Sequence, residues 1–209
     1  PLSDEKSIVT PSLVNLPYPV LSSSSGKEHT CALTADNSIW CWGGLFSAND
    51  VYSYADVDGY KKIISGSVNP SISISSGTNH SCSVQFNHEV YCWGLNEYGQ
   101  SGGDYDKIFS SVSKINGISN ASALALGGTY SCALLLNMEV WCWGNTDYIF
   151  DTTSSYSPQK MAPILGNNMV ISSGNEHICT VNTFSQLNCW GTNNIYLRSQ
   201  INVNLALSN

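Results

Sequence analysis

The chain has 209 residues, enough for one sizeable domain or two small ones, and a hydrophobic fraction of 42% is sufficient for a packed core. Only 11% of the residues are charged, and the formal net charge is −7, with eight basic residues scattered along the chain. Nucleic-acid binding normally needs clustered Lys and Arg, so DNA, RNA and anionic membranes are poor candidates as partners.

An internal repeat accounts for every cysteine of the chain. A cysteine is followed ten positions later by Cys-Trp-Gly four times, and the first cysteines of successive copies are 51, 50 and 47 residues apart. The repeat predicts a single repeat domain, 1–209, in which residues 1–20 are an N-terminal extension or a completing strand. The four units are expected at approximately 21–70, 71–121, 122–168 and 169–209.

Each pair of cysteines fits one β-hairpin. If Cys31 lies opposite Cys41 in an antiparallel pair, Leu33 lies opposite Ile39, and the corresponding residues of the other units pair in the same way. Because side chains alternate between the faces of a strand, the cysteines share one face and the tryptophans the other, as expected of a sheet sandwiched between similar sheets. The turns are predicted at Asp36-Asn37, Asn87-His88, Asn137 and Ser185.

The hairpins predict the disulfide pairing. Opposing residues of an antiparallel pair have Cβ atoms about 4.5–5.5 Å apart, just within reach of a slightly adjusted disulfide. The repeat therefore selects one of the many connectivities that eight cysteines allow. The expected bridges are Cys31–Cys41, Cys82–Cys92, Cys132–Cys142 and Cys179–Cys189.

Stable disulfides are typical of an oxidising compartment, so the sequence predicts an extracellular or cell-surface protein. No apolar run approaches the length of about 18 residues that a membrane span needs. The chain opens with the charged stretch Asp4-Glu5-Lys6 in place of a signal peptide, so an exported protein is expected to be present here in its mature form or as an excised piece.

Two stretches of the chain resemble a known repeat. Residues 25–33 read Ser-Gly-Lys-Glu-His-Thr-Cys-Ala-Leu, and residues 92–100 read Cys-Trp-Gly-Leu-Asn-Glu-Tyr-Gly-Gln. They resemble the regulator of chromosome condensation repeat, with its Gly-x-x-His-Ser/Thr-x-Ala-Leu string and its Trp-Gly-x-Asn-x-x-Gly-Gln-Leu-Gly tail. The resemblance runs from about Leu21 to Leu197. It implies an all-β, β-propeller-like fold with four repeats of about 50 residues, each with a disulfide-clamped hairpin.

The chain also departs from that pattern. Only the second unit keeps the Gly-Gln tail, and it has Ser101 where Leu is expected, while the third unit has Tyr130 in the His position. The family usually closes seven blades and this chain supplies four, so a closed ring, an open arc and a part of a longer chain all stay open. The nucleotide-exchange activity of nuclear members is not carried over, because disulfides and an acidic chain do not suit that setting.

Metal and catalytic sites are disfavoured. His29, His80 and His177 each lie two positions before a cysteine, but zinc sites usually bring cysteines in pairs two to four residues apart. The acidic residues match no calcium-loop spacing, and no nucleophile motif or phosphate-binding loop occurs. We therefore expect no catalytic residue, no metal, no cofactor and no enzyme activity.

The aromatic residues divide into two groups. Their fixed place in the repeat favours packing between blades over a sugar-binding platform, and predicts that Trp42, Trp93, Trp143 and Trp190 are buried and equivalent. Tyrosines in the variable segments are candidates for recognition. These are Tyr52, Tyr54, Tyr60, Tyr98, Tyr105, Tyr148 and Tyr156.

The sequence leaves two functions open. The first is a non-catalytic extracellular structural or adhesive repeat protein that assembles head to tail with copies of itself or another extracellular protein. The second is a secreted or cell-surface protein-binding propeller, such as an inhibitor or a receptor ectodomain. Two sequons predict N-glycans at Asn79 and Asn120. The alternating run Ile201–Leu207 is the expected donor strand for assembly, and Ser7–Thr10 is a further β-prone run.

Overall fold

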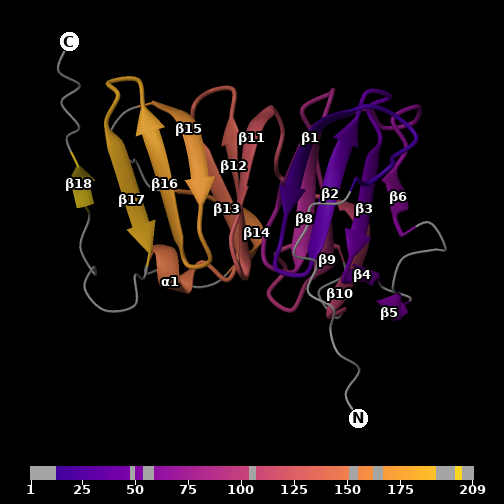
Figure 1. Ribbon diagram of the computed structural model, residues 1–209. Helices are drawn as coiled ribbons and strands as arrows, with labels where there is room; N and C mark the ends of the chain where they lie inside the picture. The colour runs from indigo at the N-terminus through magenta and orange to yellow at the C-terminus, as the bar shows by residue number, and fades with distance from the viewer. Residues whose placement is uncertain are drawn as a thin grey trace.

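The computed structural model describes residues 13–47, 50–53, 59–103, 107–150, 155–161, 167–191 and 201–203. These residues form four antiparallel sheets of four strands each, one two-stranded sheet and one short helix (Figure 1). In each large sheet the strands follow one another in sequence order, apart from the two-stranded insertion in the first. We call the four sheets blades 1 to 4.

The elements of the blades are as follows. Blade 1 contains β1 (Val20–Ser25), β2 (His29–Thr34), β3 (Ile39–Gly43) and β6 (Lys61–Ile64), with β4 (Leu45–Ser47) and β5 (Asp50–Ser53) paired beside it. Blade 2 contains β7 (Ser71–Ser76), β8 (His80–Gln85), β9 (Val90–Leu95) and β10 (Phe109–Lys114). Blade 3 contains β11 (Ala121–Leu126), β12 (Tyr130–Leu135), β13 (Val140–Gly144) and β14 (Ser155–Lys160), with α1 (Asp147–Phe150) before β14. Blade 4 contains β15 (Asn168–Ser173), β16 (His177–Asn182), β17 (Leu187–Gly191) and β18 (Ile201–Val203).

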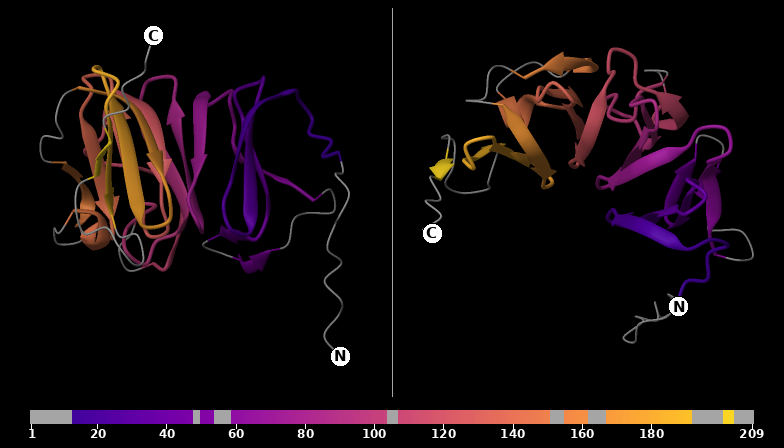
Figure 2. Two further views of the ribbon diagram at one scale, coloured as in Figure 1. Left: turned by 60° about the vertical axis from the view of Figure 1, so that its left-hand side comes forward. Right: turned by 90° about the horizontal axis from the view of Figure 1, so that it is seen from above.

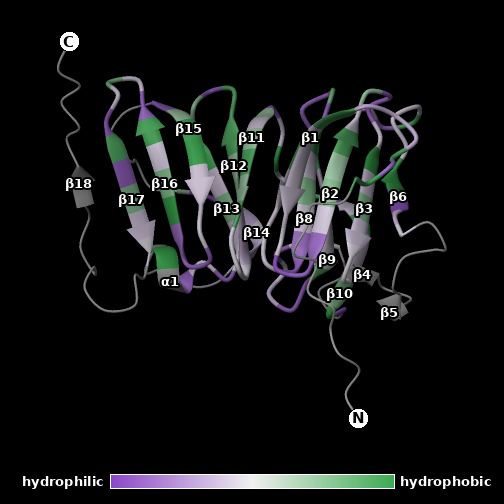
Figure 3. Ribbon diagram, in the orientation of Figure 1, coloured by the Kyte–Doolittle hydropathy of each residue, from purple (hydrophilic) through white to green (hydrophobic). Residues whose placement is uncertain are grey.

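The four blades stand side by side in an open arc. Seen from above, they fan around a shared centre, and blades 1 and 4 lie at opposite ends (Figure 2). The first strands β1, β7, β11 and β15 contact one another in turn. Hydrophobic residues run along the strands, whereas hydrophilic residues gather in the connecting loops (Figure 3). The expected all-β, β-propeller-like fold is confirmed, and in this structure its four blades leave the ring open.

The hairpins have the predicted register. Cys31 pairs with Cys41 and Leu33 with Ile39, and each of the other three units pairs its residues in the same way. The turns contain one residue with positive φ, between 59° and 67°, at Asn37, His88, Met138 and Ser185. The predicted turns are confirmed. In the third unit the residue with positive φ is Met138, and the preceding turn residue Asn137 accepts the backbone N–H of Glu139 on its side-chain oxygen at 3.1 Å.

All four expected disulfides are present, and no cysteine is free. The bridged residues have Cα atoms 4.0 or 4.1 Å apart, somewhat closer than the spacing of about 4.5 Å for directly opposed residues at non-hydrogen-bonded positions. Each bridge ties two strands that are already adjacent along the chain. The disulfides therefore clamp individual hairpins and do not link one blade to another.

Replacing both Cys82 and Cys92 by Ala is expected to lower the free energy of unfolding by about 2–3 kcal/mol, because the bridge restricts a short loop of the unfolded chain. Urea unfolding of both proteins measures the difference. The matched control replaces Cys179 and Cys189, which close a loop of the same length but are only half-buried. The Cys82/Cys92 variant should lose more stability, since it also loses buried contacts, and equal losses would contradict this expectation.

The C-terminal strand pairs within its own blade. Residues Ile201–Val203 form β18, which pairs with β17 and places Ile201 opposite Cys189. In this structure the strand therefore completes blade 4, and its donation to another subunit stays a prediction. Residues 204–207 of the predicted strand lie outside the described residues, as does Ser7–Thr10. Residues 13–19 contain no strand, and blade 1 takes its fourth strand, β6, from within its own unit.

Candidate functional site

The most elaborate contacts of the molecule lie between consecutive blades. Trp93 of blade 2 belongs to a buried cluster with the Cys31–Cys41 hairpin of blade 1. Trp143 of blade 3 packs in the same way with the Cys82–Cys92 hairpin of blade 2. These indoles are 5% and 0% exposed. Each blade thus presents a tryptophan face to the preceding blade and a disulfide face to the following one.

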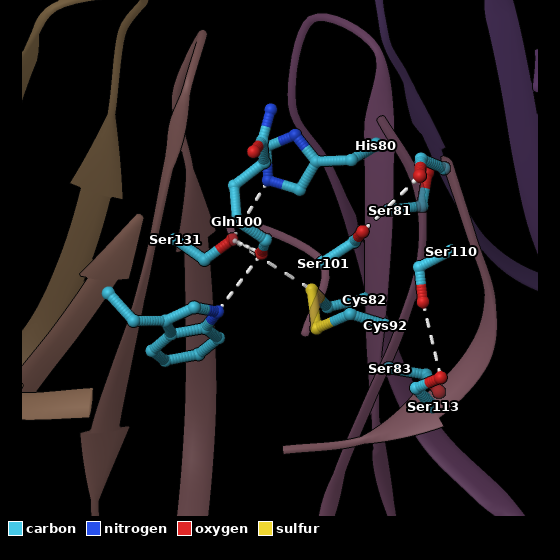
Figure 4. The surroundings of a disulfide bond; sticks show 12 residues. His80, Ser81, Cys82, Ser83, Cys92, Gln100, Ser101, Ser110, Ser113 and Ser131 are labelled. Atoms are coloured by element: carbon cyan, nitrogen blue, oxygen red, sulfur yellow. Dashed lines mark hydrogen bonds between the residues drawn. A yellow bond between two sulfur atoms is a disulfide. The ribbon is translucent and has the colours of Figure 1, made fainter. Parts of the chain in front are cut away.

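A hydrogen bond between a His ring and a hydroxyl group accompanies each of the first two contacts. His29 Nε2 lies 2.8 Å from Ser81 Oγ of the next blade, and His80 Nε2 lies 2.8 Å from Ser131 Oγ (Figure 4). Both rings are buried. In both contacts the histidine of one blade bonds to the residue that directly follows the equivalent ring residue of the next blade. Ser81 follows His80, and Ser131 follows Tyr130.

The third contact, between blades 3 and 4, has a different ring and different hydrogen-bond partners. Tyr130 replaces the histidine, and its hydroxyl donates to the backbone carbonyl of His177 at 2.6 Å and lies 3.0 Å from that of Gly174. Ile178 stands where blades 2 and 3 have Ser81 and Ser131, and it belongs to the same buried cluster as Tyr130. The larger ring of Tyr130 bonds to backbone carbonyls, and it is paired with the apolar Ile178 instead of a hydroxyl group.

Glycine makes room for these rings. A Cβ atom on Gly77 would lie 2.5 Å from Cε1 of His80, and one on Gly127 would lie 1.9 Å from Cε1 of Tyr130. Any side chain at these positions would displace the ring. The spacing Gly-x-x-His therefore reflects close packing of the ring on the glycine three residues earlier.

Gln100 closes the contact between blades 2 and 3, and sequence reasoning did not assign it a role. It is 0% exposed, and its backbone carbonyl accepts from Ser131 Oγ at 2.8 Å and from Trp143 Nε1 at 2.9 Å (Figure 4). The only signal in the sequence was the Gly-Gln tail of the second unit. In the third unit α1 replaces that tail and places Ile149 in the cluster between blades 3 and 4.

Burial keeps the histidines of these contacts neutral. Loss of hydration, with a smaller contribution from repulsion by His29, lowers the pKa of His80 to about 3. Burial also lowers the pKa of His29. Ser131 Oγ donates its hydrogen to Gln100 O, so Ser131 Oγ accepts the Nε2–H of His80. The other ring nitrogen of His80, Nδ1, is buried without a hydrogen-bond partner.

At each end of the arc, one face has no neighbouring blade among the described residues. Trp42 of blade 1 is half-buried, and so are Cys179 and Cys189 of blade 4, whereas the other six cysteines are 0% exposed. The prediction of four equivalent buried tryptophans is therefore wrong for Trp42 and Trp190. No described blade covers the face that carries Trp42, whereas Trp190 is half-buried although it packs against the cluster between blades 3 and 4.

The two end faces have different compositions. The tryptophan face of blade 1 carries Trp40, Trp42 and Thr30, with Lys62 Nζ 4.7 Å from the centre of the Trp40 ring. The disulfide face of blade 4 carries no Lys, Arg, Asp or Glu among the described residues of its strands. It consists of Val170, Ser172, Cys179, Val181, Leu187 and Cys189, with His177 at one end.

The remaining predicted sites differ in how far they are exposed. Asn120 is exposed in the turn before β11, whereas Asn79 is half-buried and the third residue of its sequon, Ser81, is buried against His29. Tyr60 packs edge-on against Trp40, and Tyr98 and Tyr156 are exposed. The side chains of Tyr52, Tyr54, Tyr105 and Tyr148 lie outside what the structure describes.

No group of three or more His, Cys, Asp or Glu residues in the described ranges is arranged to hold a metal ion. Within the same part of the chain, none of the helices has the length and apolar character needed to cross a membrane.

Four-stranded blades that pack face to face around a shared centre define a β-propeller-type repeat protein. The family model of the regulator of chromosome condensation repeat matches residues 23–44 and 72–100, which lie in blades 1 and 2. Blades 1 and 2 are therefore similar to this repeat. Such propeller repeats indicate a protein-binding domain.

Known relatives agree with this assignment. The regulator of chromosome condensation of Homo sapiens is 30% identical over 103 residues, which are 48% of this chain and 24% of that protein. Among solved structures, human WBSCR16 matches with a TM-score of 0.75 and 22% identity over 90% of this chain and 54% of its own. Prp20p of Saccharomyces cerevisiae has a TM-score of 0.70 and 18% identity over 85% and 46%, in a structure described with its binding to Gsp1p and histones.

The fold also occurs in an ectodomain. That of the Physcomitrella patens receptor kinase CR4 has a TM-score of 0.56 and 22% identity over 85% of this chain and 40% of its own. At these identities the structural likenesses establish the fold alone. The chain spans about a quarter of the curated relative and about half of these solved chains.

Proposed function

We propose that this chain is a non-catalytic extracellular protein-binding module that assembles head to tail into a larger structure. The observation that carries the proposal is the pair of end faces that no described blade covers, one a tryptophan face and the other a disulfide face. Within the chain, every tryptophan face that has a preceding blade packs on that blade's disulfide face. Exposed sheet faces of this type recruit other chains.

The extracellular setting is supported by the disulfides, because four bridges persist only under oxidising conditions. The occurrence of the same fold in a receptor ectodomain is consistent with it. Its partners are then copies of itself or another extracellular protein, as Prp20p has protein partners in another setting. Asn120, which is exposed, is the better placed of the two glycan acceptors.

Secretion tests this function. With a signal sequence fused to it, the chain is expected to leave eukaryotic cells as a fully oxidised protein, lighter than the reduced chain by the eight hydrogens lost in four bridges. Intact mass, glycosidase treatment of parent and Asn120→Gln, and sedimentation then report oxidation, glycan and assembly. A monomer that folds equally well with free thiols in a reducing cytosol would contradict the proposal.

A second candidate is a binder that uses the rim formed by the hairpin turns. Phe86, Leu136 and Phe184 lie in the β8–β9, β12–β13 and β16–β17 turns and are 72%, 55% and 74% exposed. Apolar side chains repeated on one rim form a surface suited to protein contact. Replacing all three by Ser would abolish such binding without changing assembly, which separates the two candidates.

A further inference from the structure

We infer that the disulfide face of blade 4 is the docking site for blade 1 of a second copy, with His177 of one copy pairing with Thr30 of the next. This inference rests on the proposed head-to-tail assembly and specifies its surface. In the structure His177 is exposed and Thr30 is half-buried, and each lies on an end face that has no neighbouring blade in the described part of the chain.

The three internal contacts define a pairing rule. A histidine faces a hydroxyl group in the next blade, at Ser81 and at Ser131, whereas a tyrosine is followed by Ile178. The type of residue at this position thus depends on which ring the preceding blade supplies. At the ends of the chain the ring is a histidine, His177, and the residue in the receiving position is a threonine, Thr30, which satisfies the rule.

The apolar surfaces match in the same way. In the contact between blades 1 and 2, Trp93 and Tyr91 cover Leu33, Ile39 and the Cys31–Cys41 bridge. The equivalent residues of blade 1 are Trp42 and Trp40, since they hold the same places relative to Cys41 as Trp93 and Tyr91 hold relative to Cys92.

On blade 4 the equivalent receiving surface is Val181, Leu187 and the Cys179–Cys189 bridge. Two aromatic rings thus meet two aliphatic side chains and a disulfide, as they do inside the chain. Burial of this uncharged surface is favourable because apolar area is removed from water without desolvating a charged group on blade 4.

The loops beside the rings support the same docking. The backbone N–H of Lys27 donates to Thr78 O at 3.0 Å, that of Thr78 to Gly127 O at 3.1 Å, and that of Gly128 to Asn175 O at 2.8 Å. Each blade therefore donates one backbone hydrogen bond to the loop of the next. In the assembly Asn175 donates in the same way to residues 26–27 of the second copy.

Two copies joined at both ends would contain eight blades, within the range of four to eight blades that propellers close. Head-to-tail contacts close into a ring or continue as a filament, depending on the rotation per copy. A dimer and a filament are thus both assemblies of this contact, and we expect the dimer because each copy forms an open arc around one centre (Figure 2).

The first experiment weakens each face in turn. Trp42→Ala on blade 1 or Val181→Glu on blade 4 should raise the dissociation constant about thirtyfold or more, as loss of a central interface residue does. Sedimentation velocity over a concentration series measures it, with Phe184→Ser in a hairpin turn as the control. Circular dichroism verifies that each variant is folded.

The outcomes separate the inference from the proposed function. If the parent assembles and both end-face variants assemble equally well, the inference is overturned while the proposed assembly stands. If the parent is strictly monomeric at tens of micromolar, both are overturned. Weakening by the end-face variants, with the Phe184→Ser control unchanged, supports both.

The second experiment replaces the pair of His177 and Thr30 by a Tyr and Ile pair like that of Tyr130 and Ile178. Thr30→Ile should weaken assembly about tenfold, because His177 then lacks a hydroxyl partner in a buried contact. Adding His177→Tyr recreates the pair formed by Tyr130 and Ile178 and should restore assembly. The inference is overturned if the double variant assembles more weakly than Thr30→Ile alone, or if neither variant differs from the parent.

Discussion

Replacing Trp143 by Ala is expected to lower the free energy of unfolding by about 3–5 kcal/mol. The indole is 0% exposed between blades 2 and 3 and packs on the Cys82–Cys92 hairpin. Its removal leaves a cavity that neighbouring sheets cannot fill, because each is held by its own hydrogen bonds. It also removes the N–H that Gln100 O accepts at 2.9 Å.

The chain contains its own control for this experiment. Trp42 has the same place in the Cys-Trp-Gly motif but is only half-buried on an end face. Trp42→Ala should therefore cost about 1 kcal/mol or less at concentrations where the chain is monomeric, since surface substitutions have small effects. Urea unfolding followed by circular dichroism measures both variants. Equal losses would mean that the motif stabilises each blade internally and that blade packing is not the cause.

Acidification is expected to destabilise the protein by about 1.4 kcal/mol per pH unit through His80 alone, between pH 6.5 and about 3. The unfolded chain takes up a proton on this histidine near pH 6.5, whereas the folded chain resists until about pH 3. The unfolded state therefore binds more protons in this window, so stability is fully present above pH 6.5 and falls with pH. Burial of His29 adds a loss in the same direction.

The measurement should stay between pH 7 and 5, where carboxylates contribute little and the expected loss from His80 is about 2 kcal/mol. Urea midpoints of the parent should fall across this range, and His80→Gln should flatten the dependence although it lowers stability overall. The control is His88→Asn, because His88 lies in a turn at positive φ, which Asn tolerates, and keeps its ring partly exposed. An unchanged slope in His80→Gln would contradict the assignment.

The sequence by itself determined the hairpins of this protein. The constant spacing of ten between paired cysteines, together with antiparallel pairing, predicts that Leu33 faces Ile39 and that each bridge lies within one unit. These features could be inferred because they depend on residues close together along the chain. The resemblance to a known repeat then implied that the hairpins belong to four-stranded blades.

Only the tertiary structure decided what the repeated residues do. His80 and Ser131 are neighbours although 51 positions separate them, and Gln100 reaches both Ser131 and Trp143 from a loop of the preceding blade. Trp143 and Trp42 occupy the same local motif, yet one is buried and the other borders solvent. The difference arises because the cover of each face comes from another blade, so local sequence cannot specify whether that cover is present.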